Sequence, residues 1–181
     1  MKSINISELL EKPMKLYEKF HLQTSLRDTA PNIPVKQWPK EWTKTYYKAY
    51  SRMEEITLPK PAISAKIPFI GTLKKRKSAR DFANDALPAQ DLSSLLYFSA
   101  GENLDKNKGS QKKRFYPSPG ARYPLEVYVI LRKSEVDSGI YHYYVKNNSL
   151  ERIGDYDNMS FQKLTSQKWF NNASCLVIIT A

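Results

Sequence analysis

Two short segments, residues 127–131 and 175–179, consist entirely of hydrophobic residues and most constrain the fold of this chain. Each has the length of a strand and is far too short to span a bilayer. A strand that is hydrophobic on both faces is typical of a sheet interior with a covering layer on each side. We therefore expect an α+β domain with buried strands at residues 127–131 and 175–180, the second of them central in the sheet.

A helix that covers this sheet is predicted at residues 88–100, because Pro88 suits the first turn of a helix. The apolar positions of one helix face follow at the required spacing: Leu92, Leu95, Leu96 and Ala100. Gly101 comes next and is expected to end the helix in the left-handed conformation.

A hairpin is predicted after the first buried strand. Residues 139–145 form a tyrosine-rich strand, residues 146–149 supply a turn, and residues 150–153 form the partner strand. We interpret His142, inside the first of these strands, as a packed strand residue. A further helix is expected from Phe161 to Trp169, before the strand that contains Cys175, which we interpret as an inert buried thiol.

Residues 1–65 differ from the rest and are predicted to form an arm of short helical and extended segments. Leu16, Tyr17 and Phe20 suggest a short helix, and prolines at 31, 34 and 39 favour an extended connection. An aromatic residue at every fourth position predicts a further short helix over residues 42–50, followed by a brief strand at residues 56–58. Residues 66–181 are then the main domain.

Charge and composition exclude several classes of protein. Lys and Arg total 29 against 18 for Asp and Glu, which gives a formal net charge of +11. One cysteine and two histidines make a disulfide framework or a metal cluster a poor interpretation, and we predict no metal site. With neither a signal peptide nor an apolar span in the sequence, we expect a cytoplasmic protein that attracts anions and does not bind membranes.

The first candidate site is the basic run at residues 74–80. Arg76 and Arg80 can hold phosphate oxygens with two hydrogen bonds each, and Ser78 adds a hydroxyl. On charge alone, the run is also compatible with a solvated surface or with nucleic-acid binding.

The second candidate is the turn at residues 117–126, Pro-Ser-Pro-Gly-Ala-Arg-Tyr-Pro-Leu-Glu. Pro117 and Pro119 fix two φ angles, and Gly120 lets the backbone come close to a ligand. Such a turn before a buried strand can present a hydroxyl and backbone N–H groups in fixed directions.

The two motifs, in this order and separated by the helix at residues 88–100, resemble the nitroreductase family. Within it, the chain is similar to the SagB-type dehydrogenases, which form thiazoles and oxazoles. The arm carries part of the likeness, in Tyr50 and the segment Ile56-Thr57-Leu58-Pro59.

The resemblance implies an α+β nitroreductase fold that binds FMN at a dimer interface. Carried over by position, Arg76, Ser78 and Arg80 hold the phosphate and ribityl chain with help from Lys77. The residues that line the flavin ring, normally from the other subunit, are Pro117, Ser118, Gly120 and Ala121.

The implied reaction is the oxidation of peptide thiazolines or oxazolines, with a hydride passing to the flavin and a base removing the neighbouring proton. Family members carry a Lys-Tyr pair directly after the strand that corresponds to residues 175–180, and then the rest of the flavin site. Because no such pair follows Ala181, we assign no catalytic base and expect the fold to be incomplete. The partner is then a second copy or a complementary subunit.

Two other functions stay open. One is a flavin-free truncated scaffold or peptide-binding subunit of a peptide-modifying complex. The other, which rests on net charge alone and is ranked last, is nucleic-acid binding.

Overall fold

The computed structural model describes residues 15, 34–37, 46–62, 68–83, 85–104, 112–164 and 166–181. The chain divides into two compact units, residues 1–39 and 40–181. In the first unit, the described residues include a short 3-10 helix, η1 (Val35–Gln37). The helix predicted around Leu16, Tyr17 and Phe20 lies outside the described residues, as does Trp42.

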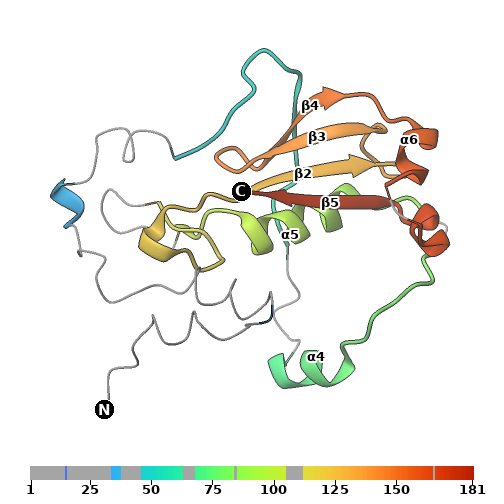
Figure 1. Ribbon diagram of the computed structural model, residues 1–181, viewed down its shortest axis with the longest axis horizontal. Coiled ribbons are helices and arrows are strands. Elements are labelled where there is room, and N and C mark those ends of the chain that lie inside the picture. The colour runs from blue at the N-terminus through green and yellow to red at the C-terminus, as the bar shows by residue number, and fades with distance from the viewer. Residues whose placement is uncertain are drawn as a thin grey trace. The chain divides into compact units, whose positions relative to one another are not determined.

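The second unit is built on an antiparallel sheet, which has five strands within the described residues. Its strand order is β1-β4-β3-β2-β5 (Figure 1). The strands are β1 (Glu55–Thr57), β2 (Glu126–Leu131), β3 (Gly139–Tyr144), β4 (Ser149–Gly154) and β5 (Cys175–Thr180). The predicted strands at residues 127–131, 139–145, 150–153 and 56–58 are confirmed within one or two residues at each end.

The hairpin of β3 and β4 sets the register of the sheet. Tyr144 pairs with Ser149 across the turn, in which Asn148 has a φ of 50°. Asparagine adopts this left-handed conformation more readily than most residues, so the turn sequence favours this hairpin. Because side chains alternate along a strand, the register decides which residues face the core.

Helix α5 (Ala89–Ala100) covers one face of the sheet and confirms the helix predicted at residues 88–100 (Figure 1). Leu92 and Leu96 are fully buried and belong to a single core cluster with alternate residues of β2 and β3. The sheet contributes Val127, Val129, Leu131, Tyr141, Tyr143 and Leu150 to this cluster.

The prediction for Gly101 is wrong in its geometry. Its φ is −68° and its ψ is 175°, so the helix ends in an extended and not a left-handed residue. Glycine is needed here for another reason, since a Cβ would lie 2.4 Å from the carbonyl oxygen of Tyr97.

The helix predicted from Phe161 to Trp169 is also wrong, because two short helices replace it. These are α6 (Asn158–Gln162) and the 3-10 helix η4 (Lys168–Asn172). Phe161 is buried and stacks on Phe170 with 5.0 Å between ring centroids, so the chain folds back on itself to bring the two rings together. A further helix, α4 (Phe69–Lys75), precedes the basic run and was not predicted.

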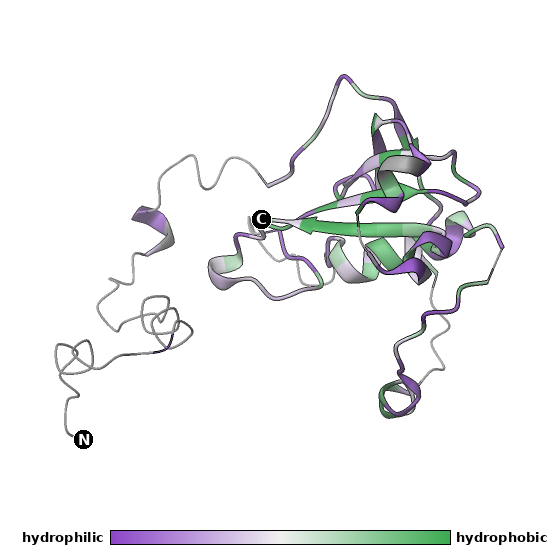
Figure 2. Cartoon of the chain, turned by 45° about the vertical axis from the view of Figure 1, so that its right-hand side comes forward, coloured by the Kyte–Doolittle hydropathy of each residue, from purple (hydrophilic) through white to green (hydrophobic). Residues whose placement is uncertain are grey.

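The prediction that residues 175–180 form a central strand is wrong for the described sheet. Strand β5 lies at its edge and pairs with β2 alone among the described strands. Ile179 is 61% exposed and Val177 is 36% exposed, although the strand is apolar along its length (Figure 2).

Residues 46–50 are extended, so the helix predicted over residues 42–50 is wrong for this part of it. The backbone groups here bind the sheet and its flanking loop instead of one another. The carbonyl of Tyr46 accepts a hydrogen bond from Arg114, and the N–H of Tyr50 donates to Glu151. These tertiary bonds satisfy backbone groups that a helix would otherwise pair internally.

We expect Leu96→Ala to lower the free energy of unfolding by about 2–5 kcal/mol, because it leaves a cavity between α5 and the sheet. Leu95→Ala is the matched control, since Leu95 is on the same helix but 53% exposed. Urea unfolding of both variants measures the difference, and equal losses would contradict the observed packing of α5.

Candidate functional site

The basic run lies where helix α4 ends. Arg76 is the residue that follows the helix, and its N–H donates to the carbonyl of Thr72. Residues 76–80 continue as an exposed extended segment. Among the described residues, no ion pair involves Arg76, Lys77 or Arg80. The segment therefore presents cationic donors to solvent, in the chemistry that a phosphate group requires.

The second predicted motif forms a tight turn around the 3-10 helix η3 (Pro119–Ala121). Gly120, Ala121 and Tyr123 have φ values of 63°, 52° and 48°. Ala121 and Tyr123 are non-glycine residues in a sparsely populated region, which is typical of turns held in one conformation by their surroundings. The Ser118 hydroxyl oxygen accepts a hydrogen bond of 2.9 Å from the N–H of Tyr123, and its own hydrogen is left to donate elsewhere.

Aromatic and cationic side chains pack in the region just before this turn in the sequence. Tyr116 packs edge-to-face on Tyr123 with 5.5 Å between centroids, and burial raises the pKa of its phenol. Arg114 is buried, with its guanidinium 4.9 Å from the ring centroid of Tyr47. The Tyr47 hydroxyl donates to Glu102, and burial together with this bond raises the pKa of Tyr47. Tyr116 thus packs on the turn, and Arg114 packs on the segment at residues 46–50.

The structure does not bring the two predicted groups together within this chain. Residues 76–80 follow α4, whereas residues 117–121 precede β2, and they lie apart in both views (Figures 1 and 2). A ligand that touches both groups therefore needs a second polypeptide or a rearrangement. The roles of Arg76, Lys77, Ser78, Arg80, Pro117, Ser118, Gly120 and Ala121 stay predictions.

A buried histidine between two carboxylates lies on the face of the sheet opposite α5. His142 is 1% exposed, with Nδ1 2.7 Å from an oxygen of Glu151 and Nε2 2.9 Å from an oxygen of Glu126. Tyr128, His142 and Glu151 are paired across neighbouring strands, which places their side chains on one face. Sequence reasoning missed this cluster, although polar residues at alternate positions of β2 were a signal for it.

Three residues cap this histidine on its outer side. The Lys48 ammonium donates a hydrogen bond of 2.6 Å to the Tyr128 hydroxyl, which lies 3.1 Å from the Tyr50 hydroxyl. The rings of Tyr50 and Tyr128 lie 5.1 and 5.3 Å from that of His142. We call Lys48, Tyr50 and Tyr128 the lysine–tyrosine cluster.

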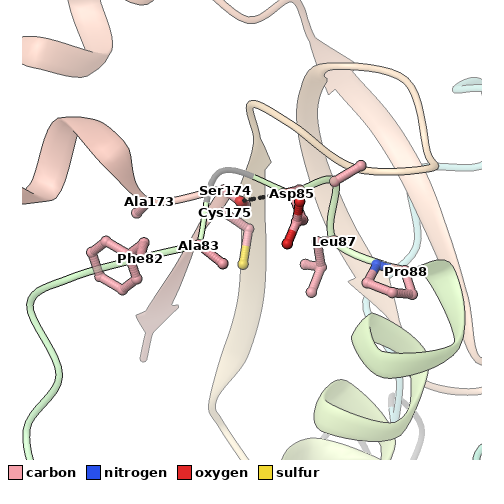
Figure 3. Close-up of a pocket in the computed structure, with 9 residues that line it drawn as sticks. Phe82, Ala83, Asp85, Leu87, Pro88, Ala173, Ser174 and Cys175 are labelled. Atoms are coloured by element: carbon pink, nitrogen blue, oxygen red, sulfur yellow. Dashed lines mark hydrogen bonds between the residues drawn. The ribbon is translucent and has the colours of Figure 1, made fainter.

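An apolar pocket of about 340 Å³ lies between the segment that leads from the basic run to α5 and the start of β5 (Figure 3). Its wall includes Phe82, Leu87, Pro88 and Cys175, and the Ser174 hydroxyl bonds to the carbonyl of Asp85 at its rim. Burial raises the pKa of the Cys175 thiol, in keeping with the inert thiol expected from the sequence. The pocket lies between the segment that follows the basic run, at Phe82, and the start of β5, at Cys175.

No helix in the described ranges is long and apolar enough to cross a membrane. No group of three or more His, Cys, Asp and Glu side chains in those ranges could hold a metal ion.

Comparison with known proteins identifies the class to which this fold belongs. A model described as the nitroreductase family matches residues 73–181, and the chain belongs to that family. A protein of Methanocaldococcus jannaschii named as a nitroreductase is 34% identical over 84 residues, which cover 46% of this chain and 40% of that protein. The chain therefore spans less than half the length of this curated relative.

Two solved structures are also similar to this chain. A nitroreductase structure from Ralstonia eutropha is 37% identical, with a TM-score of 0.43, and the match covers 54% of this chain and 42% of that one. Another, from Anabaena variabilis, has a TM-score of 0.59 at 17% identity and covers 86% of this chain and 35% of that one. The second likeness supports the expected α+β nitroreductase-like fold. Nitroreductase-family proteins generally use FMN and are commonly homodimers.

We expect His142→Leu to lower the free energy of unfolding by about 3–5 kcal/mol, because it leaves the buried Glu151 carboxylate without its partner. The double variant His142→Leu/Glu151→Gln removes the buried charge while keeping an oxygen to accept the N–H of Tyr50, and it is expected to lose less than the single variant. Chemical denaturation measures both, and a double variant less stable than the single one would contradict this account.

Proposed function

We propose that this chain is part of an FMN-dependent oxidoreductase. The observation that carries the proposal is the pairing of two motifs in one nitroreductase-family chain. The first is an exposed run of cations with no ion pair to the other described residues, and the second is a tight turn held in an unusual backbone conformation. Family membership supports an oxidoreductase, and the two motifs supply the groups that a flavin nucleotide requires.

The residues present fit FMN by their chemistry. Arg76 and Arg80 are exposed guanidinium groups, suited to the dianionic phosphate, and Ser78 and Lys77 add neutral and charged donors. Gly120 is exposed on the turn and has no Cβ, so a flat ring can approach the backbone there. The Ser118 hydroxyl retains a hydrogen to donate to an electronegative edge of that ring. When bound, FMN supplies the hydride-accepting chemistry.

The chain's own residues would bind and orient the cofactor. The arginines fix its phosphate end, and the turn at residues 117–121 fixes the ring end. Because the two groups lie apart in one chain, we propose that a second copy or a complementary carboxy-terminal segment completes the pocket. The apolar, partly exposed β5 would be covered in the same assembly.

The likeness to the SagB-type branch narrows the proposed reaction. We propose that the assembled enzyme oxidises thiazolines or oxazolines of a modified peptide to thiazoles or oxazoles in the cytoplasm. Tyr50 and the segment Ile56-Thr57-Leu58-Pro59 support this branch, and in the structure both pack on the sheet of the main unit. The basic net charge suits an acidic peptide partner better than a neutral one.

The phosphate role of the arginines predicts a difference between FMN and riboflavin. In flavin fluorescence titrations of the purified chain, FMN is expected to bind more tightly than riboflavin, which lacks the phosphate. Arg76→Ala/Arg80→Ala is expected to weaken FMN binding by about ten-fold or more, since a hydrogen bond to a charged group contributes about 1.5–3 kcal/mol. The affinity for riboflavin should change little.

Lys146→Ala/Lys163→Ala is the matched control, because it removes two exposed cations that lie outside both motifs. Equal losses in the control and in the arginine variant would show that only net charge matters. A chain that binds no flavin, alone or with a complementary segment, would contradict the proposal and favour the scaffold alternative. Mass spectrometry of a thiazoline peptide incubated with the enzyme tests the reaction itself, because the product has lost the mass of two hydrogen atoms.

A further inference from the structure

The lysine–tyrosine cluster has the geometry of a proton-transfer site. The Lys48 ammonium lies 2.6 Å from the Tyr128 hydroxyl and 5.1 and 5.4 Å from the ring centroids of Tyr50 and Tyr128. The two phenol oxygens are 3.1 Å apart. Lys48 therefore donates to Tyr128, and Tyr128 can donate in turn to Tyr50. The chain of donors ends at the Tyr50 oxygen.

Groups on strands β2, β3 and β4 surround Tyr50 and fix its position. On β3, His142 contacts the ring edge-to-face, and on β4, Glu151 accepts the backbone N–H of Tyr50 at 2.9 Å. On β2, Glu126 is bound to His142 and also acts electrostatically on Tyr50. Tyr50 itself is half-buried.

Hydrogen bonds, charge and burial shift the pKa values of the two phenols in this cluster in opposite directions. The hydrogen bonds from Tyr128 and Lys48 lower the pKa of Tyr50, against the opposing charge of Glu126. Burial raises the pKa of Tyr128, so the two phenols are pushed in opposite directions. The same hydrogen bonds raise the pKa of Lys48, which keeps its ammonium charged. Pairs of groups with separated proton affinities are typical of acid–base sites.

We propose that Tyr50 is a proton-accepting residue, held by Lys48 and Tyr128 with its oxygen ready to take a proton from a bound substrate. Glu126, the last residue of the second motif, connects that motif with the cluster, because it bonds to His142 and acts electrostatically on both Tyr50 and Tyr116. The site is thus built from the segment at residues 46–50 and the start of β2.

The substrate assignment rests on the proposed function. In that reaction, a C–H bond of the heterocycle breaks, and its proton passes to the Tyr50 oxygen. The electron pair of that bond would form the new ring double bond while the neighbouring carbon gives up a hydride, for which bound FMN would supply the acceptor chemistry. Protonated Tyr50 then returns the proton to solvent, with Lys48 remaining charged throughout.

A spectrophotometric titration of the full chain tests the site without flavin. We follow the near-ultraviolet tyrosinate band from about pH 7 to 11, around the ordinary phenol value of about 10. The wild-type chain should show an early ionisation that Tyr50→Phe removes and Lys48→Met moves to higher pH. Tyr46→Phe is the control, because it removes a tyrosine of the same segment whose ring is 37% exposed. An early ionisation that survives in Tyr50→Phe, or none in the wild type, overturns the proposal.

Activity separates this proposal from the proposed function. With an assembled flavin enzyme, Tyr50→Phe should lower kcat about 100-fold or more, as loss of a general base does. Lys48→Met should move the acid limb of the pH–rate profile to higher pH. Full activity with an unchanged profile in Tyr50→Phe overturns the catalytic role. Absence of any oxidation, alongside an early ionisation assigned to Tyr50, overturns the proposed function and supports the proton site.

Discussion

One cross-strand row of residues holds the described sheet together and decides what lies on each face. Ile178, Tyr128, His142, Glu151 and Glu55 are paired in succession across β5, β2, β3, β4 and β1. His142 lies at the centre of this row and bonds to carboxylates from the strands on either side. Because the side-chain period is two, fixing this row on one face sends Val129, Tyr141 and Leu150 to the other, where α5 covers them.

The same row explains why the segment at residues 46–50 belongs with the sheet. Tyr50 bonds through its backbone to Glu151 and packs on His142, while Lys48 reaches Tyr128. Tyr47 and the carbonyl of Tyr46 meet Arg114, which leads into the turn at residues 117–123. A segment distant in sequence therefore packs on the polar face of the sheet and on Arg114.

The fold also accounts for the division of the candidate flavin groups. Residues 76–80 follow an exposed helix, and residues 117–121 lead into β2, so one copy of this chain presents two separate sets of donors. Nitroreductase-family proteins are commonly homodimers, and a site made from two polypeptides is consistent with that architecture. Ile179, on the edge strand β5, is 61% exposed in this chain.

The sequence by itself determined the strands of the main unit, the helix at residues 89–100, the β3–β4 hairpin and the family, because periodicity, turn residues and motif order are local. It also identified the residues of both motifs. Only the tertiary structure decided that β5 is an edge strand in the described sheet, that residues 46–50 are extended, and that Phe161 folds back onto Phe170. It alone revealed His142 between Glu126 and Glu151, and Lys48 beside Tyr128. These contacts join residues from 9 to 80 positions apart, and no local pattern records which distant partner will satisfy a buried polar group.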